Sequence, residues 1–250
     1  MIITGIIGLL LVILGVVLMI GFAFVARRGF RPPMRPISGY EALATQVGQA
    51  VESGGRVHIS LGQGSINSAD TSATLAGLAM LDYVADASSI SDLSPIATTG
   101  DATTLPAMSD TIRRAYARKE VPEKFESISA RLVSLDPYSM AGGTTSLIVD
   151  DDVRANVLVG SFGAEMTLPA EAGQRRRIPQ VAGSSQLDGQ AVAYAMADHS
   201  LIGEEMFVSR AYLGRDPWAI AALATQDVLR WIAIAAILVG SVLAAVGLIH

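Results

Sequence analysis

The hydrophobic positions of the chain form two different patterns. Continuous apolar runs occupy both ends, over Met1–Val25 and Trp231–Ile249, and no Asp, Glu, Lys or Arg occurs before Arg27 or after Arg230. Between these runs, short stretches rich in β-branched residues alternate with longer stretches of helical spacing. Because about 20 apolar residues in a helix cross a bilayer, the pattern predicts a soluble domain held between two transmembrane helices.

The runs and the composition between them divide the chain into four predicted segments. These are a transmembrane helix over 1–26, a proline- and arginine-rich linker over 27–37, a soluble α/β domain over 38–215, and a long helix over 216–250 that contains the second span at about 231–249. A cleaved secretory signal is the competing interpretation of the first run, but a signal has a basic start and a shorter apolar stretch. Asp216 is the expected N-cap of the last helix, and Pro217 fits its first turn.

The middle of the chain alternates between predicted strands and helices, after an opening helix over Ser38–Ser53 with Ser38 as its cap. The predicted strands are Arg56–Leu61, Pro95–Thr99, about Ser127–Ser134, Asn156–Val159, Ile178–Ala182 and His199–Ile202. The predicted helices are Thr71–Ala85, Leu105–Lys119, Tyr138–Val149, Ala164–Gln174, Asp188–Ala197 and Glu204–Leu213, with Pro169 expected to kink or shorten the fourth. This alternation predicts a Rossmann-like α/β domain, with a parallel sheet of about six strands and helices on both faces.

Composition excludes several classes of function. The net charge of −5 argues against nucleic-acid binding, which requires a concentrated basic face. The chain has no cysteine, which removes disulfides, thiolate metal sites and a cysteine nucleophile. His58 and His199 are isolated and lack the spacing of a zinc site. We therefore predict no metal and no cofactor.

The basic residues beside the spans predict an orientation in the membrane. Arg27, Arg28, Arg31 and Arg35 follow the first run and Arg230 precedes the second, whereas neither outer end carries Lys or Arg. The positive-inside rule then places the domain in the cytoplasm and both termini outside the cell (inner) membrane. Small residues recur on one helical face at Ala236, Gly240 and Ala244, and at Gly8 and Gly15, which favours helix pairing within the chain or between copies.

Glycines follow five of the six predicted strands, at Gly62, Gly100, Gly160, Gly183 and Gly203. In a parallel sheet the carboxyl ends of the strands form the ligand crevice, where glycine lets a backbone approach a ligand. Glycine also suits a tight turn after a strand, which needs no ligand. Gly62-Gln63-Gly64 begins like a dinucleotide fingerprint, but position 67 is Asn, so the third glycine is missing.

Further candidate residues lie at the same strand ends. Ser161, within Val159–Gly163, resembles the nucleophile of a hydrolase elbow, with Val159 where that pattern has glycine and with Asp188 or Asp198 and then His199 following in order. The alternative is an ordinary turn with Phe162 packed inward. The carboxylates that follow strands are Asp101, Glu165, Glu204 and Glu205. Each is a candidate ligand for a cation, or a favourable charge at a helix N-terminus.

Several motifs resemble those of an uncharacterised family of bacterial membrane proteins, described only as a domain of unknown function. They are Asn156–Glu165, Glu171–Gly173, Asp198–Phe207 and Ala211–Leu213. The resemblance implies the two-span architecture and brings no catalytic residue. Relatives are expected to have one glycine where this chain has Gly142-Gly143.

Two functions remain open. No catalytic motif is complete, and two anchors flank the domain, so we expect a membrane-anchored scaffold that contacts the bilayer and associates with itself or with other membrane subunits. The alternative is a ligand- or nucleotide-binding sensor, or an enzyme, that uses the glycine-lined crevice. The basic run Arg175-Arg176-Arg177 is expected to be a solvated turn, or a contact for anionic lipid or an acidic partner.

Overall fold

A computed structural model describes residues 2–29, 34–214 and 216–245, apart from the side chains of residues 2–4, 6, 7, 243 and 244. It divides into two compact units: Pro36–Gly214, and the two ends of the chain, residues 1–35 and 215–250. Of the predicted linker, residues 30–33 lie outside the described residues, as do residues 246–250 of the predicted second span.

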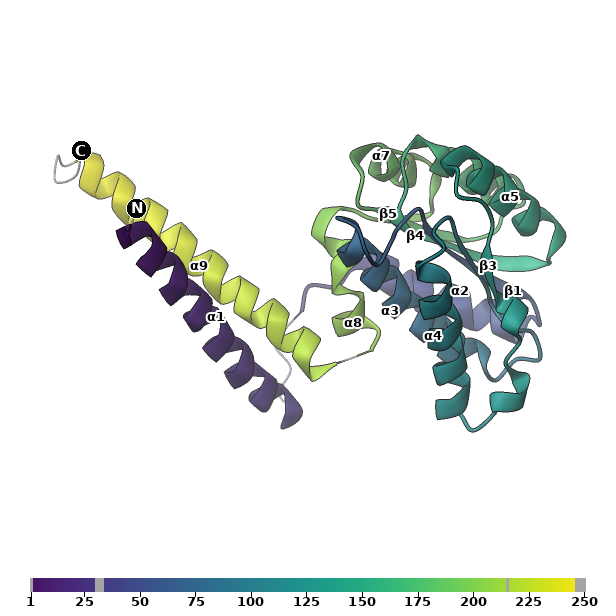
Figure 1. Cartoon of the computed structure of the whole chain (residues 1–250), viewed down its shortest axis with the longest axis horizontal. Helices are drawn as coiled ribbons and strands as arrows, with labels where there is room; N and C mark the ends of the chain where they lie inside the picture. The colour runs from purple at the N-terminus through teal and green to yellow at the C-terminus, as the bar shows by residue number, and fades with distance from the viewer. Residues whose placement is uncertain (1, 30–33, 215, 246–250) are drawn as a thin grey trace. The chain divides into compact units, whose positions relative to one another are not determined.

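The domain between the ends contains one sheet of six parallel strands in the order β3-β2-β1-β4-β5-β6 (Figure 1). The strands are β1 Arg56–Gly62, β2 Ile96–Thr99, β3 Ala130–Leu132, β4 Val153–Ser161, β5 Gln180–Ser184 and β6 His199–Leu201. The strand order reverses between β1 and β4, as in doubly wound α/β domains. The predicted Rossmann-like fold is therefore confirmed.

Helices cover both faces of the sheet (Figure 1). One face carries α2 Ser38–Glu52, α3 Thr71–Ser88 and α4 Thr104–Arg118, and the other carries α5 Pro137–Asp150, α6 Thr167–Arg175 and α7 Leu187–Met196. Short helices complete the domain: η1 Pro122–Lys124, η2 Ser127–Ser129, η3 Ala164–Met166, η4 Gly203–Val208 and α8 Ser209–Tyr212.

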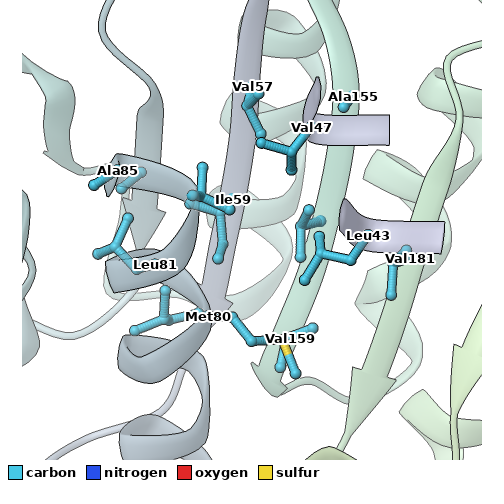
Figure 2. Close-up of a cluster of buried hydrophobic side chains, with 14 of the residues drawn as sticks. Leu43, Val47, Val57, Ile59, Met80, Leu81, Ala85, Ala155, Val159 and Val181 are labelled. Carbon is cyan, nitrogen blue, oxygen red and sulfur yellow. The ribbon is translucent and has the colours of Figure 1, made fainter. Parts of the chain in front are cut away.

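The larger core lies between the sheet and helices α2, α3 and α4. Figure 2 shows Leu43 and Val47 of α2 and Met80 of α3 beside Ile59 of β1 and Val159 of β4. All five side chains are fully buried. Alternate residues of a strand point to opposite faces, so the residues between these strand positions face α5 and α6. That second face is less apolar, because it includes several polar side chains.

Two strands have different lengths from those predicted, one at the edge of the sheet and one at its centre. The edge strand β3 is shorter than the predicted 127–134, because Ser127–Ser129 forms a 3-10 turn instead. The central strand β4 is longer than the predicted 156–159, because it pairs with β1 on one side and β5 on the other. Neighbouring strands supply hydrogen bonds that extend a strand past its most apolar residues.

Several helix starts also differ from the predictions. Ser38 is the first helical residue and not the cap of α2, because Ile37 holds the extended position before it. The predicted helix 164–174 is divided into η3 and α6, so the α-helix is shortened, one of the two expected outcomes, and Pro169 lies in its first turn without a kink. The predicted helix 204–213 is likewise divided into η4 and α8.

The second unit contains two long apolar helices, α1 Ile2–Arg27 and α9 Pro217–Ala245, which pack side by side (Figure 1). Both are long and apolar enough to cross a membrane, over Gly8–Arg27 and Pro217–Val242. Asp216 accepts a hydrogen bond from the amide of Trp218 at 3.0 Å, which matches the predicted cap. The candidate span in α9 thus begins well before the expected residue 231.

Candidate functional site at the carboxyl edge of the sheet

The strand order places the predicted ligand crevice between the carboxyl ends of β1 and β4. Atoms of the chain itself pack against the two glycines at this position. A Cβ at Gly62 would collide with the Ser161 carbonyl oxygen and would lie 2.9 Å from the Phe162 ring. A Cβ at Gly160 would collide with the carbonyl oxygen of Leu61. Both glycines therefore allow the two strand ends to approach each other.

The other glycines at this edge have similar roles. The Gln63 side chain lies against Gly100, where a Cβ would collide with it. A Cβ at Gly64 would lie 2.6 Å from Thr74 Oγ1, and one at Gly183 would lie 2.9 Å from the Leu201 carbonyl oxygen. Gly203 has a φ of +59° with open space around it, so its role is conformational.

Ser161 is buried at the end of β4, and its Oγ accepts a hydrogen bond from Gln186 Nε2 at 2.9 Å. His199 lies far from it. Val181 pairs with both Val157 and His199, so Ser161 is four residues along and two strands across from His199. That separation is about 16 Å. The structure does not bring the predicted serine and histidine together.

The candidate carboxylates are separate and are used locally. Burial opposes ionisation of Asp101, but hydrogen bonds from Thr103 and Thr104 outweigh it and lower the pKa of this carboxyl group. The amides of Thr103 and Thr104 donate to it at 2.9 and 3.0 Å. Glu165 is buried, and its Oε1 accepts from the Gly163 amide at 2.7 Å.

Glu204 and Glu205 begin η4, beside the first helix of the domain. Glu205 accepts from the Ile202 amide at 3.5 Å, as expected of a carboxylate at a helix N-terminus. The Tyr40 hydroxyl donates to the Glu205 carbonyl oxygen at 2.6 Å, and its ring stacks on Tyr212 with centroids 5.1 Å apart. Burial raises the pKa of the Tyr40 phenol, which therefore stays a donor. The start and end of the domain are thus joined at the carboxyl edge.

Sequence reasoning missed a chain of buried polar side chains under α6. His58 Nδ1 lies 2.7 Å from Asn156 Oδ1, and His58 Nε2 lies 3.0 Å from Thr98 Oγ1. Asn156 donates to Gln180 Oε1 at 2.8 Å, and Gln180 donates to the Ala170 carbonyl oxygen at 3.0 Å. In the sequence, each of the strands β2, β1, β4 and β5 has one of these polar residues. That pattern could have indicated the network.

The directions of these bonds indicate which ring nitrogen of His58 carries a hydrogen. Asn156 uses its amide nitrogen as donor to Gln180, so its oxygen accepts from His58 Nδ1–H. In a neutral imidazole with its hydrogen on Nδ1, Nε2 accepts from the Thr98 hydroxyl. Burial lowers the pKa of His58 to about 4, in agreement with this pattern.

A family model described as Domain of unknown function (DUF6754) matches residues 3–250. The chain belongs to this family. Neither the search of curated proteins nor the search of solved structures found a match. The match covers both apolar helices as well as the domain, and so supports the predicted resemblance to an uncharacterised family.

Two buried polar groups at the carboxyl edge of this DUF6754 member lack a partner, as do groups of Gln46, Ser88 and Ser129 elsewhere among the described residues. Gln63 Nε2 and Ser185 Oγ are buried and have no hydrogen-bond partner within the described part of the chain. Such orphaned groups are uncommon in folded proteins. No cluster of three or more His, Asp or Glu side chains that could hold a metal occurs among the described residues.

The basic run lies at the opposite, amino edge of the sheet. Arg175 pairs with Glu171 at 2.7 Å, and Arg176 donates to the Val149 carbonyl oxygen. Arg177 has a φ of 55° and borders two open hollows of about 380 and 420 Å³. Two of the three arginines thus make contacts within the domain.

Among the described small residues predicted to pack between helices, one faces the neighbouring helix and others do not. A Cβ at Gly15 would lie 3.7 Å from Leu229 Cδ1, so Gly15 faces α9. A Cβ at Gly8 or Gly240 would meet no atom within 4 Å, and Ala236 is exposed. The side chain of Ala244 lies outside the described residues.

Proposed function

We propose that this protein is a membrane-anchored, self-associating scaffold whose α/β domain is an interaction module and not a nucleotide-binding enzyme. The observation that carries the proposal is the closed switch point between β1 and β4. Gly62 and Gly160 make room there for Ser161 and Leu61 of the same chain. A dinucleotide would need that room for its pyrophosphate.

The attachment of the domain supports an anchoring role. Tyr40 and Glu205 join the start and the end of the domain at one edge, and each end continues toward an apolar helix. A domain with two tethers at one edge has less freedom to turn than a domain with one. We propose that α1 and α9 span the cell (inner) membrane, with the domain in the cytoplasm and both termini outside, since the arginines flank the domain side of each helix.

The experiment is co-purification of two differently tagged copies after mild detergent extraction. The scaffold proposal predicts that the second tag is recovered with the first, and that native mass measurement gives more than one copy per particle. Mixing two separately extracted preparations controls for exchange in detergent. Monodisperse monomers that carry no other subunit would contradict the proposal.

A second function, ligand binding at the same edge, is favoured by the orphaned Gln63 Nε2 and Ser185 Oγ. The Gln63→Met substitution separates the two proposals by the sign of its effect. Removing a buried amide without a partner should leave the melting temperature unchanged or raise it. A ligand held by that amide would co-purify with the wild type and be lost from Gln63→Met, as denaturing mass spectrometry of the extract would show.

A further inference from the structure

The packing of α1 against α9 fixes the register between the two candidate spans. The Arg27 guanidinium lies 5.4 Å from the centre of the Trp218 ring. Twelve residues earlier in α1, a Cβ at Gly15 would lie 3.7 Å from Leu229 Cδ1. Both contacts describe antiparallel helices in one register, in which the middle of α1 lies beside Leu229.

This register places two charges at the depth of the membrane centre. Before Arg27, α1 has no charged residue, so a bilayer that covers its apolar residues is centred near Gly15. Asp227 and Arg230 of α9 flank Leu229, the residue that Gly15 faces. The sequence alone predicted the second span at about 231–249, with Arg230 just before it. The helix pairing instead covers residues from Trp218 onward.

The two charges lie on the face of α9 that points away from α1. Asp227 and Arg230 are one turn apart and form an ion pair of 3.8 Å, with side chains 68% and 51% exposed. Ala221 and Thr225 are buried, and at 100° per residue their face is opposite to that of the ion pair. In a bilayer, such an exposed pair would face lipid or another polypeptide. Ionisable residues at this depth nearly always face protein or water.

We infer that this face of α9 binds the same face of a second copy of the chain. This inference rests on the proposed self-association within a membrane. The pair is self-complementary. Around a two-fold axis along the membrane normal, Asp227 of each copy lies one turn from Arg230 of the other, and both charges are shielded from lipid. A second copy is the one partner certain to carry both charges at the same depth.

Charge reversal tests the contact in the full-length protein. Asp227→Arg and Arg230→Asp each leave the four charges at the interface with one sign, and each should lower the co-purified fraction of a second tagged copy by about tenfold or more. The double reversal restores opposite charges and should recover association. The matched control is the same reversal of Asp110 and Arg113, an exposed pair on α4 with the same residue types and spacing, which should leave co-purification unchanged.

Cross-linking tests the face without altering the charges. Because the chain has no cysteine, single cysteines can be placed at will. Ile234 and Ile237 follow Asp227 and Arg230 by two turns on the same face and are 39% and 67% exposed. Ile234→Cys and Ile237→Cys should form disulfide-linked dimers in membranes upon mild oxidation, whereas the buried Thr225→Cys should not.

The outcomes separate the two proposals. If wild-type copies do not co-purify, the proposed self-association itself fails. If they co-purify and both single reversals leave the fraction unchanged, self-association stands and this surface is wrong. Cross-links of Ile234→Cys or Ile237→Cys to a different membrane protein, without dimers, would likewise overturn the inference in favour of another subunit.

Discussion

Polar side chains lie among apolar residues in two regions of this protein. The two regions differ in whether these side chains are buried with hydrogen-bond partners or exposed. In the domain, His58, Asn156 and Gln180 are fully buried. The side-chain nitrogen and oxygen atoms of these three residues have partners on neighbouring strands or on α6. On α9, Asp227 and Arg230 have each other but remain more than half exposed on an apolar helix. The first arrangement is complete within one chain, whereas the second leaves a polar surface to be covered.

The difference shows where a partner is to be expected. A buried polar network that satisfies itself stabilises one packing of the core and offers nothing to a partner. An exposed charge pair costs little in water, but each charge costs about 3 kcal/mol at the centre of a membrane helix. Association with another copy would reduce that cost. The comparison is therefore the basis for two proposed roles: the hydrogen-bonded side chains around His58 stabilise the fold, and α9 carries the proposed association.

The largest effect is expected from breaking the buried chain at its centre. Asn156→Leu leaves the Nδ1–H of His58 and the Oε1 of Gln180 without partners in a dry core. Each orphaned group costs about 1–3 kcal/mol, so the free energy of unfolding should fall by about 4 kcal/mol. Urea unfolding of the detergent-extracted protein, followed by circular dichroism, measures this change.

Thr98→Val is the matched control for that substitution. It preserves shape and leaves only the acceptor His58 Nε2 without a donor, so it should cost about 1–2 kcal/mol. Equal losses from the two variants would mean that the two groups orphaned by Asn156→Leu cost no more than the single group orphaned by Thr98→Val.

The second effect is a dependence of stability on pH. Burial, with a smaller contribution from Arg131, lowers the pKa of His58 from 6.5 to about 4, against the raising effects of the Asn156 hydrogen bond and Asp151. Between these values the unfolded chain binds a proton that the folded chain does not. The stabilisation is therefore complete above pH 6.5 and is lost as pH falls toward 4, by about 3 kcal/mol in all.

Unfolding curves at pH 7 and pH 4.5 should show this loss for the wild type, and a smaller one for His58→Gln. Gln has no titrating group but can still donate to Asn156. If His58→Gln loses as much stability as the wild type between these pH values, other groups cause the acid sensitivity and His58 is not the sensor.

The strand and helix order was predictable because apolar spacing is local, but the roles of the glycines were not. A missing Cβ after a strand makes room either for a ligand or for the chain itself. At Gly160 only the position of the Leu61 carbonyl oxygen decides between them. Ser161 and His199 appeared in a hydrolase order, but the parallel register places them at opposite ends of their strands.

Neither the hydrogen-bonded side chains around His58 nor the depth of the Asp227–Arg230 pair could be predicted from the sequence, and the reason is the same. The His58 chain depends on the register that places His58 beside Asn156, and Asn156 beside Gln180. The depth of Arg230 depends on how far α9 slides along α1, and the apolar run at 231–249 indicates a different depth from the packed pair. Each property belongs to a long-range pairing and not to a local pattern.

The smallest effect is expected from a pair of charges that matches the α9 pair but lies in water. Asp110 and Arg113 repeat the residue types and spacing of Asp227 and Arg230, but on a water-exposed face of α4, with 2.7 Å between them. In water the Coulomb energy of such a pair is small and is screened by salt. Reversing both charges should therefore shift the melting temperature by less than about 1 °C. A large shift would mean that local helix electrostatics, not surroundings, set the effect of such pairs. The contrast with α9 would then lose its basis, because the same reversal would be costly in either place.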